Sequence, residues 1–418
     1  MILGYRLLSA SVFLLLVLAV SPGAPSLTIT GSAVDPSGRP IPDATVMVYH
    51  AGVLNGYSTF CPSCYRDCGK RTKTDSSGAY TISNLATGLW FDLLFVRDGY
   101  APEIVRVKDL SAGIAPIATL QARPSITDPS HAVKGHVVDA AERPVPDAVV
   151  TTIGFENEHG SAIGTFPGLD PLAVTDQNGN FEIDYTQPAK RMLVTVESRT
   201  LALRFATLIT GPQSQKIELE EGATVRGRLT LDGKPVAGAE IGLVGQQQGG
   251  YGPALSIVGD PYPETRIGTQ QDGTFVISNV PTGVRWFVYP KMESVATKGS
   301  AEPKICVTAR PREIVDVGEI SLGHGYRLRG RIILNDGKPL HDGTRVLLIS
   351  EPVRDAQEAL LDKDGRFEFL GLPKGDYSIS PSVRGYSVAN NQNDAIHVSI
   401  QRNIDDLILS LVPMQPER

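Results

Sequence analysis

The chain has 418 residues, with 39 basic and 45 acidic side chains and a net charge of −6. No long Lys/Arg run offers a basic surface, so the charge excludes nucleic acid as the main partner. Its 42 glycines and 30 prolines interrupt the chain too often for a helical fold, while 41% hydrophobic residues suffice for folded cores. The length predicts about two to four domains.

The first segment has the layout of a secretory signal peptide. One positive charge at Arg6 precedes an apolar run over residues 7–20, and small residues follow at 21–24. Proline is poorly tolerated just after a cleaved bond, and Pro25 follows Ala24, so we predict cleavage after Gly23. A retained anchor is the alternative, but the run is shorter than a spanning helix needs. We expect a secreted, periplasmic or cell-envelope protein with no transmembrane segment after cleavage.

The rest of the chain repeats one pattern four times, with a period of about 100 residues. Each copy has an extended segment around a glycine, a turn leading into a proline, a variable insert, and an Asp-x-x-Gly type turn followed by an aromatic residue. The opening glycines are Gly31, Gly135, Gly227 and Gly330, and the aromatic residues are Tyr80, Phe181, Phe275 and Phe367. The copies predict four domains, at residues 26–122, 129–221, 222–323 and 324–413.

The pattern predicts β-structure throughout. Segments such as 45–49 and 377–380 alternate apolar and polar residues, as in strands with one face on a core. In the Asp-x-x-Gly turns an Asp side chain can cap the backbone and the Gly can adopt a left-handed conformation, which suits hairpins. Calcium loops also gather carboxylates, but the spacing here does not match an EF-hand. We therefore predict β-sandwiches, joined by short linkers into a semi-rigid rod.

These motifs resemble the carboxypeptidase regulatory-like domain. The resemblance rests on the glycine strand, the turn leading to proline, the T-D-x-x-G-x-[FY] hairpin and the L-x-x-G turn, and it covers almost all of the predicted mature chain. It implies four tandem transthyretin-like Greek-key β-sandwich domains, related in fold to carbohydrate-binding modules. It also implies a non-catalytic module, because this domain accompanies many different proteins.

Common catalytic signatures are absent from the sequence. None of the seven histidines is followed by Glu three residues later, as the zinc site of a metallocarboxypeptidase requires. His-Glu-x-x-His, Gly-x-Ser-x-Gly and phosphate-loop motifs are also missing. We therefore predict no enzyme activity and assign no catalytic residue, metal or cofactor.

One local feature is specific to the first copy, the cysteine cluster Cys61, Cys64 and Cys68. In an oxidising compartment cysteines first predict disulfides, and we expect a local bond closing on Cys68 that staples the insert. A metal site or Cys-x-x-Cys redox chemistry is the alternative. A second cysteine pair for a four-ligand site is missing, since the fourth cysteine is the distant Cys306.

The inserts fall at the same place in every copy, so each domain presents its variable loop at the corresponding end. Long inserts with aromatic residues suit stacking on sugars or docking a protein, although the same rings can cap the edge of their own domain's core. These aromatic residues are Tyr57, Phe60, Tyr65, Phe166, Tyr251 and Tyr262.

Arginines alternate along two opening strands and are predicted to face outward. They either bind an acidic glycan or partner, or protect an edge strand from aggregation, and we favour the second. They are Arg226, Arg228, Arg327, Arg329 and Arg331.

The whole pattern predicts an exported, non-catalytic binding or scaffold protein with a protein or glycan partner at the cell envelope. Carbohydrate binding through the insert aromatics is the alternative.

Overall fold

The structure is a computed structural model. It describes residues 26–414 except 59–60, 109–112, 124–130, 165, 167, 187–188, 247–254, 259–266, 342, 352 and 389–394, and it leaves the side chains of 246 and 255–258 undescribed. The predicted signal peptide lies outside the described residues. Within them, strands dominate and one short helix, α1 (Met292–Val295), occurs, which confirms the all-β prediction. No helix in this part of the chain is long and apolar enough to cross a membrane.

The described strands form eight sheets. Each two facing sheets enclose one of four large apolar clusters. We name them the first to fourth sheet pair in chain order. The first pair sets β4 (Ala79–Ala86), β1 (Ser26–Val34) and β7 (Ala118–Thr119) against β3 (Arg71–Lys73), β2 (Thr45–Val53), β5 (Leu89–Val96) and β6 (Glu103–Val107). The second sets β12 (Asn180–Asp184), β8 (Ala132–Asp139) and β15 (Gly211–Leu219) against β10 (Gly160–Ile163), β11 (Leu172–Val174), β9 (Val149–Asn157), β13 (Arg191–Glu197) and β14 (Arg204–Ile209).

The third and fourth pairs follow the same plan. The third sets β17 (Lys234–Pro235), β16 (Ala223–Leu231), β20 (Thr274–Val280) and β23 (Ile314–Leu322) against β19 (Leu255–Val258), β18 (Ile241–Gln246), β21 (Val284–Pro290) and β22 (Lys304–Thr308). The fourth sets β27 (Arg366–Leu372), β24 (Tyr326–Leu334), β31 (Ile404–Pro413) and β29 (Tyr386–Val388) against β26 (Ala356–Leu360), β25 (Arg345–Ser350), β28 (Gly375–Ser382) and β30 (Ile396–Ile400). The fold is thus a series of β-sandwiches, and the predicted domain boundaries stay a prediction.

The opening strand of each pair is an inner strand of its sheet. β1, β8, β16 and β24 each pair antiparallel with the hairpin strand β4, β12, β20 or β27, and parallel with the closing strand β7, β15, β23 or β31. The prediction that the arginine-bearing strands are edge strands is therefore wrong. The parallel partner comes from the far end of each unit, so no local pattern in the sequence indicates it.

The arginines on these strands contact neighbouring strands and turns instead. Arg226 Nε lies 3.0 Å from Asp316 Oδ2, and Arg329 Nε lies 2.7 Å from Glu368 Oε1. Arg327 pairs with Asp405 in the same way. Since their charges are already matched across the sheet, these exposed pairs serve mainly to align strands.

The Asp-x-x-Gly turns form the predicted hairpins. Asp176 Oδ1 accepts the backbone N–H groups of Asn178 and Asn180, both at 2.8 Å, and Gly179 has φ +80°. Asp362 Oδ1 accepts the N–H groups two and four residues on at 2.9 and 2.8 Å. These carboxylates cap the backbone, as the hairpin interpretation predicts.

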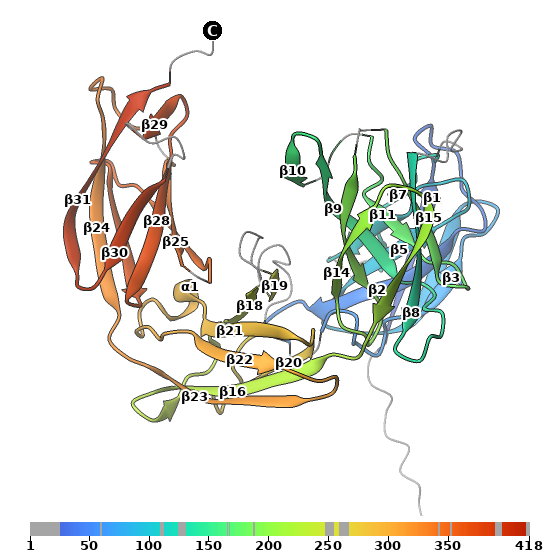
Figure 1. Cartoon of the computed structure of the whole chain (residues 1–418), viewed down its shortest axis with the longest axis horizontal. Helices are drawn as coiled ribbons and strands as arrows, with labels where there is room; N and C mark the ends of the chain where they lie inside the picture. The colour runs from blue at the N-terminus through green and yellow to red at the C-terminus, as the bar shows by residue number, and fades with distance from the viewer. Residues whose placement is uncertain are drawn as a thin grey trace, which may run out of the picture.

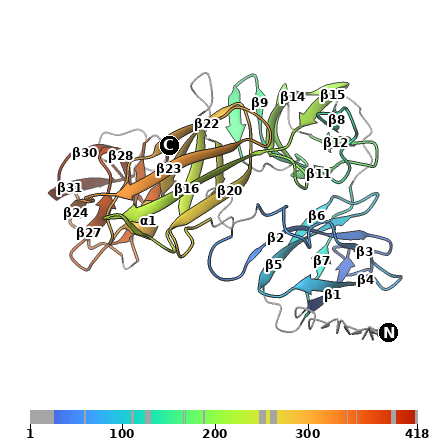
Figure 2. The same ribbon diagram turned by 90° about the horizontal axis from the view of Figure 1, so that it is seen from below.

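The sheet pairs form an open arch rather than a straight rod (Figure 1). The third pair lies at the base, with the fourth pair at one end and the first two at the other, and Figure 2 shows the first and second pairs next to each other. They meet through a separate apolar cluster in which Met47, Tyr49 and Leu94 of the first pair pack on Val149 of the second. Burying this outer sheet face sets the two pairs side by side, which explains the departure from a rod.

Candidate functional site

The described parts of the first insert, residues 54–58 and 61–70, fold back onto β2, the strand that precedes it. The N–H of Cys64 bonds to the carbonyl of Cys61 at 2.9 Å, closing a tight turn. Within that turn, the carbonyl of Pro62 accepts the N–H of Ala51 on β2 at 2.9 Å. At its far end the N–H of Gly69 bonds to the carbonyl of Val48, also on β2, at 2.8 Å. The insert is therefore fixed to β2 at two points.

A disulfide closes the turn between Cys61 and Cys64, whose Cα atoms are 5.1 Å apart. The prediction of a local disulfide is confirmed, but its closure on Cys68 is not. Cys68 is a free thiol, 2% exposed, which packs in the core of the first pair and donates to the carbonyl of Pro62 at 3.2 Å. Burial raises the pKa of Cys68 to about 12, so this sulfur stays a neutral thiol at physiological pH.

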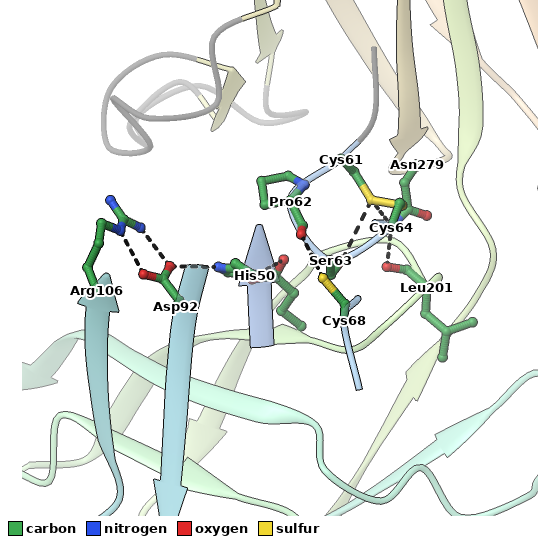
Figure 3. A network of polar contacts seen from close by, with 11 residues as sticks. His50, Cys61, Pro62, Ser63, Cys64, Cys68, Asp92, Arg106, Leu201 and Asn279 are labelled. Atoms are coloured by element: carbon green, nitrogen blue, oxygen red, sulfur yellow. Dashed lines mark hydrogen bonds and ion pairs between the residues drawn. A yellow bond between two sulfur atoms is a disulfide. The ribbon is translucent and has the colours of Figure 1, made fainter. Parts of the chain in front are cut away.

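The closed turn contacts the third sheet pair. Asn279, at the end of β20 with φ +61°, has Nδ2 3.9 Å from Cys61 Sγ and donates to the carbonyl of Leu201 at 2.6 Å. The side-chain amide of Asn279, which belongs to the third pair, thus contacts both the first insert and the second pair. Figure 3 shows Asn279 directly beside the disulfide.

Tyr57 makes a second contact with the third pair. Its hydroxyl donates to the carbonyl of Gly238 at 3.0 Å. Its ring lies so close to Gly268 that a Cβ atom there would come within 2.2 Å of it. Only glycine at position 268 leaves room for the ring. Tyr57 therefore packs directly between the first and third pairs.

An ionic cluster joins the first pair to the second. His50 on β2 places Nε2 3.0 Å from Glu197 Oε1 on β13 and Nδ1 3.4 Å from Asp92 Oδ2 on β5. Asp92 in turn accepts two hydrogen bonds from Arg106, at 2.7 and 2.6 Å. The Arg106 guanidinium lies 4.4 Å from the ring centre of Trp90. The His50, Asp92 and Glu197 side chains are at most 21% exposed, so this cluster is largely shielded from water.

The cluster holds His50 in its charged form. Burial by itself would lower the pKa of His50, but the carboxylates of Glu197 and Asp92 outweigh burial and raise that pKa to about 9. Burial likewise pushes the pKa of each carboxyl group upward. Hydrogen bonds and charge nevertheless bring both pKa values below their ordinary values, from His50 and Arg106 at Asp92 and from His50 and Tyr49 at Glu197. At neutral pH an imidazolium therefore lies between two carboxylates contributed by two sheet pairs.

The other aromatic residues predicted for the inserts divide into two groups. Tyr65 packs against the first core and shares a hydrogen bond with Ser58. Phe166 packs against the second core, with its ring edge-on to Phe155 at 4.9 Å between centroids. Phe60, Tyr251 and Tyr262 lie outside the described residues. Each described aromatic residue of this set therefore takes part in packing within the chain.

The sequence interpretation missed His50, Asp92, Glu197 and Asn279. One signal was available, because Asp92 is the single charge inside the apolar strand segment 89–96, and a charge buried in that way needs a partner. Nothing local indicates Glu197, which is 147 residues from His50. Among the described residues no three His, Cys, Asp or Glu side chains gather as metal ligands.

The solved structures that match this chain include a Bacillus anthracis protein and two streptococcal pilins. The Bacillus anthracis TIE protein is 10% identical over 94% of this chain and 76% of its own, with a TM-score of 0.21. A streptococcal ancillary pilin is 11% identical over 69% and 99%, with a TM-score of 0.23. GBS52, a minor pilin of Streptococcus agalactiae, is 13% identical over 47% and 98%, with a TM-score of 0.23. At these TM-scores the likenesses carry no argument about function.

No curated protein matches this sequence. A family profile does match, that of the carboxypeptidase regulatory-like domain, over residues 28–121. This range begins within β1 and includes the rest of the first sheet pair together with the cysteine insert. Residues 28–121 are therefore a carboxypeptidase regulatory-like domain, which confirms for this part of the chain the family that the repeated motif predicts.

Proposed function

We propose that the chain is an exported, non-catalytic scaffold of four β-sandwich domains that holds a protein partner at the cell envelope or outside the cell. The domains are those predicted from the repeat, at residues 26–122, 129–221, 222–323 and 324–413. The scaffold works by keeping its first three domains at fixed angles.

One observation carries this proposal: the first insert contacts other domains. Tyr57 and the Cys61–Cys64 turn contact the third pair, and His50 beside the insert binds Glu197 of the second. A loop free to bind a ligand would instead leave its aromatic rings exposed. Carbohydrate binding by the insert aromatics, the alternative from the sequence, stays a prediction.

Export is supported by the disulfide together with the predicted signal peptide. Disulfides persist in oxidising compartments and are rare in the cytosol. Mass spectrometry of protein recovered from the envelope and from the medium tests this point. We expect an N-terminus at Ala24 and the mass of a chain with one disulfide. Recovery of the uncleaved, fully reduced chain from the cytosol would contradict export.

Small-angle X-ray scattering of the mature chain tests the fixed arrangement. We expect one profile that matches the arch of Figure 1 and does not change with salt, because the junction is partly apolar and its charges are shielded. A profile that fits only a broad range of domain orientations would contradict the scaffold. Crosslinking in intact cells then identifies the partner, and capture of polysaccharide alone would favour the carbohydrate alternative.

A further inference from the structure

We propose that the Cys61–Cys64 disulfide is a redox-sensitive latch, whose reduction by a dithiol loosens the first sheet pair from the third. The proposal rests on the scaffold function above. It concerns a regulatory contact and assigns no catalytic role to the cysteines.

The disulfide lies where three sheet pairs meet. Asn279 of the third pair touches Cys61 and holds the carbonyl of Leu201 of the second pair. Gly69, at the end of the same insert, faces Arg199 of the second pair, since a Cβ atom at Gly69 would lie 3.1 Å from its guanidinium. Contacts to both neighbours therefore come from the single insert that carries the disulfide.

The carbonyl of Pro62, between the two bonded cysteines, transmits the state of the bond. It accepts both the Ala51 N–H and the Cys68 thiol. The disulfide restricts the turn that aims this carbonyl. When the turn opens, both bonds weaken and the insert loosens at Tyr57 and over residues 61–69. The contacts to Asn279 and Gly238 are then lost together.

The chemistry is confined to one pair of sulfurs. Cys61 and Cys64 are half-buried, so a reductant can reach them, whereas Cys68 and Cys306 are buried free thiols. Burial also raises the pKa of Cys306, to about 11. Because thiolates are the attacking species in exchange, neither free cysteine competes for the disulfide.

The step is an ordinary two-electron exchange. One thiolate of the dithiol attacks a sulfur of the Cys61–Cys64 bond and forms a mixed disulfide, releasing the other cysteine as a thiolate that takes up a proton. The second thiolate of the reductant then displaces the remaining cysteine, which is protonated in turn. The dithiol ends as a cyclic disulfide, and Cys61 and Cys64 end as two thiols.

Hydrogen exchange of the full mature chain, with and without dithiothreitol, tests the latch. We expect reduction to speed exchange roughly tenfold in residues 54–70 and 276–283 and to leave the fourth pair unchanged. Cys64→Ser should show the fast pattern without reductant. Asn279→Ala should speed exchange at 276–283 with the disulfide intact. Cys306→Ser is the matched control and should respond to dithiothreitol as the unchanged chain does.

The outcomes separate the latch from the scaffold. Faster exchange restricted to residues 61–70 would overturn the latch and leave the scaffold in place. Faster exchange over the whole first pair would also overturn it, because the disulfide would then be needed for folding. The scaffold itself is judged on the scattering of the oxidised chain.

Discussion

His50 is the residue on which the contact between the first and second sheet pairs centres. Its imidazolium contacts Glu197 of the second pair and Asp92 of the first pair, to which His50 itself belongs. Removing one partner of a buried ion pair strongly destabilises the folded protein, because the other charge stays buried without compensation. Asp92 keeps Arg106 in such a variant, whereas Glu197 loses its counterion.

We predict that His50→Gln lowers the free energy of unfolding of the first pair by about 2 to 3 kcal/mol. Urea unfolding followed by the fluorescence of Trp90 measures this, with Trp286→Phe present in every chain so that one tryptophan reports. His159→Gln, at an exposed histidine, is the control and should change stability little. Equal effects of the two substitutions would refute the role of the cluster.

The same cluster predicts a pH dependence. The pKa of His50 is raised from 6.5 to about 9, so the folded chain binds this proton more tightly than the unfolded chain. The stabilisation is therefore complete below pH 6.5 and is lost as the pH rises through about 9. We expect the difference between the unchanged chain and His50→Gln to shrink over that window. A difference that stays constant would mean that the charge on His50 does not contribute.

At the scale of elements, the four copies share one packing device. The opening glycine is the direct cross-strand neighbour of the hairpin aromatic residue in every sheet pair. In each case a Cβ atom on the glycine would lie within 2.7 Å of the ring. The pairs are Gly31 with Tyr80, Gly135 with Phe181, Gly227 with Phe275, and Gly330 with Phe367. Each copy therefore places an aromatic ring directly against the bare backbone of a glycine.

We predict that Gly135→Ala destabilises the second pair by about 1 to 3 kcal/mol, because the new methyl group displaces the Phe181 ring. Adding Phe181→Leu should recover part of the loss, as expected for coupled neighbours. Chemical denaturation of the single and double variants measures the coupling. Gly323→Ala is the control, since a Cβ atom there meets nothing within 4 Å. If the Ala and Leu effects simply add, the close approach is not the cause.

At the scale of the whole molecule, the arch depends on outer sheet faces that are apolar. Met47 and Leu94 on one side and Val149 on the other are at most 6% exposed, although none belongs to the main core of its own pair. This burial and the His50 cluster act at the same interface. The first and second pairs are thus held by both apolar and ionic contacts.

We predict that Val149→Asp separates the first and second pairs, because it buries an unpaired charge beside Glu197, with which residue 149 is in register. The radius of gyration from scattering should rise while circular dichroism keeps its β signature. Val307→Asp makes the same chemical change at a residue that is 54% exposed, and should leave the radius unchanged. An unchanged radius for Val149→Asp would show that the interface does not set the arch.

The sequence alone determined the β class, the repeated unit and its turns, because these follow from interactions between residues a few positions apart. Period-two alternation determines which side chains of a strand face a core. Asp176 and Gly179 determine a hairpin turn whatever the path of the chain before and after it. The family of residues 28–121 follows from the same local motifs.

The tertiary structure decided what lies between the units. Spacing allows Cys61 to pair within the cluster in more than one way, and burial of Cys68 in the first core left Cys64 as the partner. The opening strands became inner strands because a closing strand returns from the far end of each unit. Asn279 reaches Cys61 across 218 residues of sequence. Contacts at such separation depend on how completed sheets pack, and no short-range pattern encodes that packing.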